Sequence, residues 1–77
     1  MVGKFVQLWK LRNMFWLVTV YTEYEEHYRC VAECSSEAQA CFMARRFYRA
    51  EGEVVEECEA EMFNSFQHGD PRDYENV

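Results

Sequence analysis

Cysteine and histidine are the residue types of this chain that could bind a metal or attack a substrate. Cys30 and Cys34 lie in a segment with strand-like alternation, where four residues span about 13 Å at ~3.3 Å per residue, so these two thiols cannot ligate one ion. The sequence has no C-x-x-C pair, the spacing that would indicate zinc. We therefore expect no metal and no cofactor.

Catalysis is not indicated either. His27 with Cys30, or Cys58 with His68, could be written as a thiol–imidazole pair, but neither spacing presents a nucleophile at a strand-to-helix turn beside an oxyanion hole. The three glycines are too scattered for a phosphate-binding loop. We expect that the protein is not an enzyme and has no catalytic residues.

The densest charge lies in EGEVVEECEAEM, residues 51–62, which holds six glutamates. Glu57, Glu59 and Glu61 recur at every second position, which in a strand is a spacing of ~6.6 to 6.8 Å. This is close to the step between phosphates, which are ~3.4 Å apart along the nucleic-acid axis and further apart along the curved backbone. Like charges on one strand face cost stability, which favours a functional role for the row. The row is interpreted either as a phosphate-like surface that binds a basic protein or as a plain solubilising face.

The elements that must position this row follow from the periodicity. Residues 14–24 and 28–34 alternate as two strands joined by a polar turn, and residues 54–63 alternate as a third strand. In the third strand Cys58, Ala60 and Met62 should face the core while the glutamates face outward. Glu56 is the exception, and a bulge near residues 54–55, or a strand that starts after Glu56, would resolve it.

A helix is predicted between the second and third strands. Ser36 and Gln39 match a capping box, and apolar residues then recur at helical spacing as far as Gly52. A basic edge lies opposite this apolar face. Its members are Arg45, Arg46 and Arg49, which we expect to pair locally with Glu37, Glu51 or Glu53 rather than to bind nucleic acid.

The predicted fold is a single α+β domain, residues 1–77, with a β-β-α-β core over residues 14–63. A right-handed crossover gives the strand order 2-1-3, with the helix on one face of the sheet. Cys30 and Cys58 would then lie about 9 to 10 Å apart across the central strand, too far for a disulfide, so we expect reduced core cysteines. The tail, residues 64–77, is expected to be irregular and acidic, and residues 1–12 to form a basic helix or edge strand that covers the sheet or binds a partner.

The uncovered sheet face is the candidate partner-binding surface. It should combine an acidic row with aromatic anchors, which dominate interface energetics. The candidate residues are Glu53, Glu57, Glu59, Glu61, Glu33, Glu23, Tyr21 and Phe15.

The charge of the chain is asymmetric. Residues 1–22 carry three basic residues and no acid, whereas residues 23–77 carry fourteen acids and five arginines, within a net charge of -6. An acidic body disfavours direct nucleic-acid binding and favours basic partners. No apolar run is long enough to span a membrane, and the first dozen residues lack the pattern of a secretion signal, so we expect a cytoplasmic protein.

In its size, its acidic row EGEVVEECEAE and its hairpin–helix–strand order, the chain resembles small acidic phage proteins that inhibit bacterial defence, in particular anti-CRISPR proteins. The resemblance covers residues 14–63 and transfers no individual site residue. It implies a non-enzymatic inhibitor in the host bacterial cell that mimics nucleic acid and blocks a basic subunit of a CRISPR effector complex. The alternative function is a small interaction module that forms a homodimer or docks on a cellular protein through its open sheet face.

Overall fold

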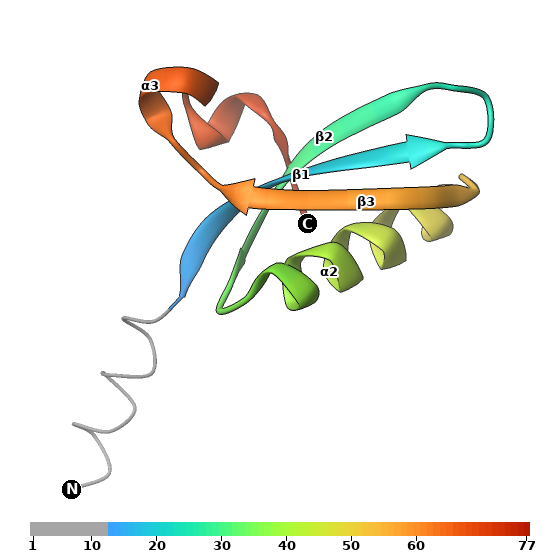
Figure 1. Cartoon of the computed structure of the whole chain (residues 1–77), viewed down its shortest axis with the longest axis horizontal. Coiled ribbons are helices and arrows are strands. Elements are labelled where there is room, and N and C mark those ends of the chain that lie inside the picture. Colours follow the sequence, from blue (N-terminus) through green and yellow to red (C-terminus); the bar gives the residue numbers. More distant parts are fainter. Residues whose placement is uncertain (1–12) are drawn as a thin grey trace, which may run out of the picture.

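The computed structural model describes residues 13–77, and the hypotheses about residues 1–12 lie outside this part of the chain. The fold is α+β, as predicted, with a mixed four-stranded sheet in the order β3-β1-β2-β4 (Figure 1). The main elements are strands β1 (Met14–Thr22), β2 (His27–Cys34) and β3 (Val55–Met62) and helix α2 (Glu37–Ala50). The predicted order with β1 between β2 and β3 is confirmed.

Strands β1 and β2 form an antiparallel hairpin whose register runs from Met14 opposite Cys34 to Tyr21 opposite His27. The turn is closed by the Thr22 N–H, which donates to the Glu26 carbonyl at 2.9 Å, and Glu25 adopts a positive φ of 62°. That left-handed backbone conformation is uncommon for a residue other than glycine. The strand therefore ends at Thr22, two residues earlier than the alternation indicated.

Helix α2 packs on the sheet face formed by the even-numbered residues, as predicted. Ala40 and Ala44 are fully buried, and their small side chains let the helix lie close to the strands. The Ser36 side chain caps the helix by accepting from the Gln39 N–H at 3.2 Å, whereas the Gln39 side chain accepts from Ser35. The core on this face is completed by Trp16, Val18, Val20, Cys30, Ala32, Cys34 and Tyr48.

Glu56 is accommodated by a bulge. Glu57 pairs with Tyr21, but the next pair along β1 is Thr22 with Val55, so that Glu56 has no partner in the register. Glu56 is the extra residue of the bulge and points out to solvent, whereas Val55 packs against the core. The bulge expected from the sequence is therefore present, one residue later than proposed.

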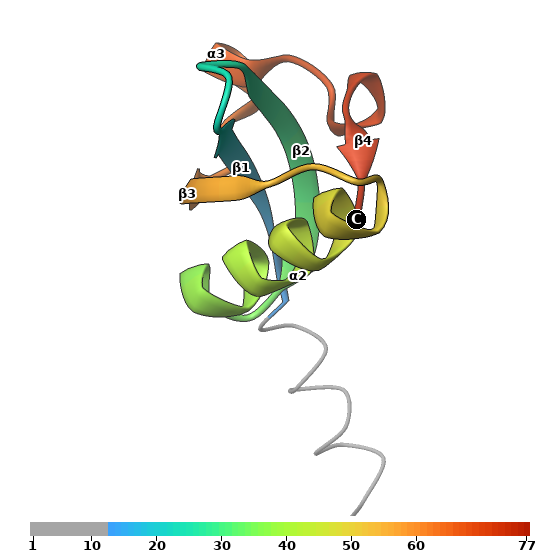
Figure 2. The same cartoon turned by 90° about the vertical axis from the view of Figure 1, so that its right-hand side faces the viewer.

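The tail differs from the irregular segment expected. It forms helix α3 (Ser65–His68), the 3-10 turn η1 (Pro71–Asp73) and strand β4 (Glu75–Asn76), which pairs in parallel with β2. Figures 1 and 2 show α3 on the side of the sheet opposite α2. Leu17 and Val31 point to that side and are only 1% exposed, so the face expected to be open is closed over part of its area.

Candidate functional site

The predicted acidic row exists and lies on an edge strand. Glu57, Glu59 and Glu61 of β3, here called the glutamate ladder, are exposed on the sheet face opposite α2. They stand beside the central strand β1, with Glu57 opposite Tyr21, Glu59 opposite Thr19 and Glu61 opposite Leu17. Because side chains alternate along a strand, all three carboxylates project from one face.

Two ladder carboxylates accept hydrogen bonds from neighbouring elements. The Tyr21 hydroxyl donates to Glu59 Oε2 at 3.4 Å, and His68 Nε2 of the tail lies 2.9 Å from Glu61 Oε1. His68 Nδ1 accepts from the Asn64 N–H at 3.0 Å, which leaves Nε2 as the nitrogen that donates to Glu61. Neither contact cancels the negative charge of the ladder.

The charge of Glu59 affects its tyrosine partner. The Glu59 carboxylate, together with partial burial and their hydrogen bond, raises the pKa of Tyr21 above its usual value. Tyr21 therefore remains a neutral donor across the physiological pH range. The hydroxyl helps to fix the Glu59 side chain beside β1.

A cation borders the ladder on the same face. Arg29 of β2 stands opposite Thr19, one strand beyond Glu59, and both line a shallow depression of about 370 Å³. No arginine of the described residues lies within 4.0 Å of a ladder carboxylate. Within residues 13–77, therefore, no arginine forms an ion pair with the ladder, and Arg29 lies across the central strand from it.

The other candidate residues are not gathered at the ladder. Glu23 lies in the turn after β1, and Phe15, 45% exposed, pairs with Glu33 near the opposite end of the hairpin. Glu53 precedes β3 and accepts a hydrogen bond from Tyr28, which belongs to the α2 side of the sheet, at 3.4 Å. Glu53 therefore does not continue the ladder, because the bulge at Glu56 interrupts the alternation between them.

The tail contributes a residue that the sequence did not single out. The sequence indicated His68 only as a thiol partner of Cys58, whereas in the structure His68 lies on the ladder side of the sheet. Its ring contacts Phe63 at 5.3 Å between centroids, and its carbonyl accepts from the Tyr74 hydroxyl at 2.6 Å. The Asn64 side chain accepts from the Phe66 N–H and caps the start of α3. Asparagine is a preferred N-cap residue, so the sequence carried a local signal for this short helix.

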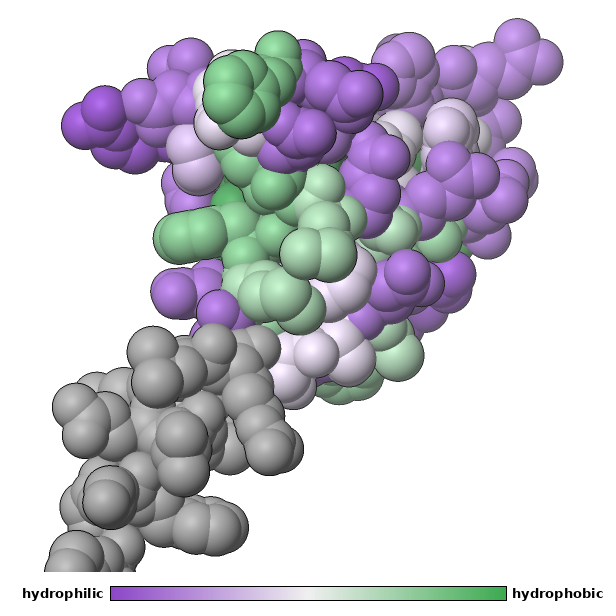
Figure 3. Space-filling model, turned by 60° about the vertical axis from the view of Figure 1, so that its left-hand side comes forward, coloured by the Kyte–Doolittle hydropathy of each residue, from purple (hydrophilic) through white to green (hydrophobic). Residues whose placement is uncertain are grey.

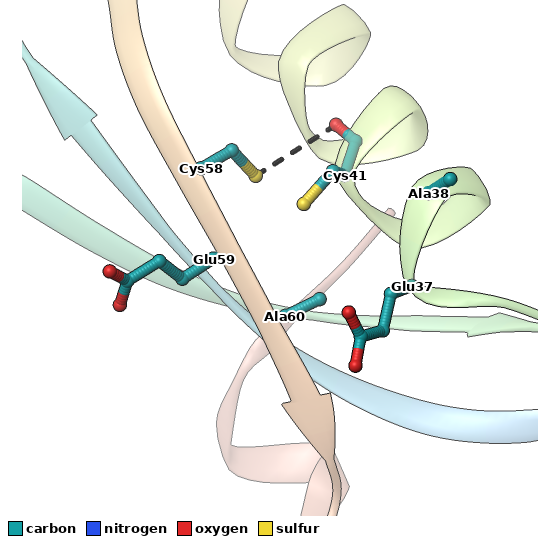
Figure 4. Close-up of a pocket in the computed structure, with 6 residues that line it drawn as sticks. All are labelled: Glu37, Ala38, Cys41, Cys58, Glu59 and Ala60. Carbon is teal, nitrogen blue, oxygen red and sulfur yellow. Dashed lines mark hydrogen bonds between the residues drawn. The ribbon is translucent and has the colours of Figure 1, made fainter.

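The other side of β3 faces α2 across a small groove. In Figure 4, Cys58 and Ala60 point toward the helix while Glu59 points away from it. The groove has a volume of about 420 Å³ and is lined by Ala38, Cys41, Cys58 and Ala60 together with the two acids Glu37 and Glu59. Met62 was expected in the core, but it is 59% exposed at the end of β3. Figure 3 shows one face of the molecule, on which apolar surface gathers beside polar margins.

The four cysteines are free thiols. Burial raises the pKa of Cys30 to about 11 and that of Cys58 to about 12, so both stay protonated near neutral pH and are weak nucleophiles. Cys58 Sγ lies 3.9 Å from the Cys41 carbonyl, a contact that orients it toward the helix. Within residues 13–77, no three metal-binding side chains converge on a common point.

The basic edge of α2 is solvated rather than paired. Arg46 and Arg49 are exposed, and the ion pairs expected with Glu37, Glu51 or Glu53 do not form, so that prediction is wrong. Residues two apart, such as Arg49 and Glu51, do not face each other at a helix end. Arg45, Arg46, Arg49 and the exposed Phe42 instead form a separate patch.

No family model, curated protein or solved structure matches this chain. Among residues 13–77, no helix has the length and apolar character needed to cross a membrane. The inferences about function therefore rest on the residues and geometry described above.

Proposed function

We propose that the protein is a non-enzymatic inhibitor that binds a basic protein through the glutamate ladder and competes with the nucleic acid bound by that protein. The observation that carries this proposal is the exposure of Glu57, Glu59 and Glu61 at alternate positions of an edge strand. The repeat of ~6.6 to 6.8 Å suits a surface that normally contacts successive phosphates.

The contacts around the ladder support a binding surface that is ordered before the partner arrives. Tyr21 and His68 hold Glu59 and Glu61 by hydrogen bonds, which reduces the side-chain entropy that binding would otherwise cost. The hydrogen-bonded carboxylates keep their charge. A rigid acidic row attracts basic partners strongly at low salt and less at high salt.

The narrower form of the proposal concerns the partner. The resemblance to anti-CRISPR proteins suggests a nucleic-acid-binding subunit of a CRISPR effector complex as the target. The same ladder would suit another basic nucleic-acid-binding protein, because the ladder recognises the spacing of charge rather than the identity of the partner.

A matched pair of triple variants tests the proposal. Changing Glu57, Glu59 and Glu61 to lysine moves the net charge from -6 to 0, since each substitution adds two charges. The control variant changes Glu25, Glu51 and Glu75 to lysine; these residues are exposed away from the ladder, and the variant has the same net charge.

Each variant is used to capture partners from a bacterial lysate, and the captured protein is then challenged with nucleic acid. We expect a basic protein that the wild type and the control variant retain, that the ladder variant loses, and that added nucleic acid releases. A partner retained equally by the ladder variant, or unaffected by nucleic acid, would refute the proposal.

A second candidate function is an assembly module that uses the free edge of β3. The position of β3 at the end of the sheet favours it, because an edge strand can pair with another chain. Pairing of two β3 strands as a homodimer would place two glutamate ladders side by side, which costs stability. Sedimentation across a range of salt concentrations tests it, since such a homodimer should form only where salt screens this repulsion.

A further inference from the structure

We propose that β3 binds its basic partner by strand addition, in which an extended segment with alternating basic and apolar residues pairs antiparallel with the outer edge of β3, which no strand of residues 13–77 occupies and which is called the free edge below. This mode of binding rests on the proposed function, since the ladder supplies the charge that selects the segment. It adds a backbone interaction and a second recognition surface, the groove between β3 and α2.

The backbone groups available at the edge can be assigned. The Phe63 N–H donates to the Phe15 carbonyl at 2.9 Å, so the backbone of Phe63 faces β1. In an antiparallel pair, successive residues direct their N–H and C=O groups to opposite sides. Along β3 the odd-numbered ladder residues therefore pair with β1, and Cys58, Ala60 and Met62 direct their backbone groups to the free edge.

The two faces of β3 then specify the two faces of an added strand. Residues of the added strand beside Glu57, Glu59 and Glu61 would lie on the ladder side, where lysine or arginine is favoured by opposite-charge pairing across strands. Residues opposite Cys58, Ala60 and Met62 would lie on the α2 side. There the groove has the small side chains of Ala38, Cys41, Cys58 and Ala60 along its floor and the acids Glu37 and Glu59 among its lining residues, so it suits small apolar side chains next to basic ones. Met62, which follows in β3, is exposed.

Charge complementarity selects a basic segment over a second copy of β3. A second β3 would bring glutamates against glutamates on the ladder side, whereas a lysine-bearing strand would neutralise them. The antiparallel direction is favoured because such pairs are slightly more stable per residue than parallel ones.

A set of three peptides tests strand addition. The parent peptide is Lys-Val-Lys-Val-Lys-Val-Lys with blocked ends, and its affinity for the full-length protein is measured by isothermal titration calorimetry. The second peptide carries N-methyl groups on the three valines, which removes the N–H groups that would pair with Cys58, Ala60 and Met62. The third carries N-methyl groups on three lysines, whose N–H groups would point away from β3, so it is matched in charge and composition.

We expect the N-methylvaline peptide to bind at least about tenfold more weakly than the parent, because it loses several hydrogen bonds to the edge. The N-methyllysine peptide should bind like the parent. Equal binding of the two methylated peptides would overturn strand addition while leaving charge-based binding intact. Equal binding of the parent peptide to the wild type and to the Glu57→Lys, Glu59→Lys, Glu61→Lys variant would instead refute the proposed function.

A variant on the protein side gives a second test. Ala60→Pro removes an N–H that faces the free edge while sparing the hydrogen bonds of β3 to β1, a position where edge strands tolerate proline. The variant should unfold at a similar urea concentration to the wild type and lose affinity for the parent peptide. Unchanged affinity in the folded variant would contradict the assigned orientation of the edge.

Discussion

Leu17→Ala provides a quantitative test of the closed part of the ladder face. The side chain is 1% exposed although it points away from α2, on the side of the sheet where Figures 1 and 2 show α3. Replacing a fully buried leucine by alanine costs about 2 to 5 kcal/mol. The elements on that side of the sheet, α3 and η1, are short and can relax toward the cavity, so we expect the lower part of this range, about 2 to 3 kcal/mol.

Urea unfolding followed by tryptophan fluorescence measures this loss. With a slope of about 1 kcal/mol per molar urea, as small proteins show, the midpoint should fall by roughly 2 to 3 M. Phe66→Ala is the matched control within the tail, because Phe66 is 98% exposed and its loss should change stability by less than about 0.5 kcal/mol. A loss below about 1 kcal/mol for Leu17→Ala would show that the face around Leu17 is not closed, and would refute the reasoning.

Three further predictions concern the helix cap, a tyrosine and the thiols. Ser36→Ala should destabilise the protein by about 1 kcal/mol in urea unfolding, because it removes the acceptor for the Gln39 N–H, whereas Ser35→Ala should cost less. A hydrogen bond to Glu26 raises the pKa of Tyr28 to about 12. The stability that this hydrogen bond contributes is therefore present below pH 10.0 and is lost as the pH rises through 12. Glu26→Gln should lower the pKa of Tyr28 in an absorbance titration. Cys30 and Cys34 are buried and should react with a thiol reagent at pH 8 only as the protein unfolds, so rapid labelling of all four cysteines in the native protein would contradict the described core.

The features predicted correctly from the sequence are those with a strong local period. Alternation placed Cys58 and Ala60 on the core side of β3 and the glutamate ladder on the other side, and Ser36 marked the start of the helix. The conflict at Glu56 was visible because one charged residue broke the alternation. Each of these signals depends on neighbours within a few residues, which is why the sequence alone carries them.

The tail and the composition of the site could not be predicted in this way. Helix α3 has four residues and β4 has two, too few to show a period or to be stable by themselves. They are ordered by distant contacts, such as the Val77 N–H that donates to the Val31 carbonyl at 3.0 Å. The contact between His68 and Glu61 also joins distant parts of the chain, so a local period could not predict it. Glu53 is separated from the ladder by the bulge at Glu56.

The central claim is that a basic partner binds at the glutamate ladder rather than at the general acidic surface. Titration of the isotope-labelled protein with a lysine decapeptide, followed by amide chemical shifts at low salt, tests it most directly. The claim predicts that the largest shift changes fall on Glu57, Glu59 and Glu61 and disappear when salt is added. Changes spread evenly over all exposed acids, or strongest in the acidic turn at Glu23–Glu26, would contradict it.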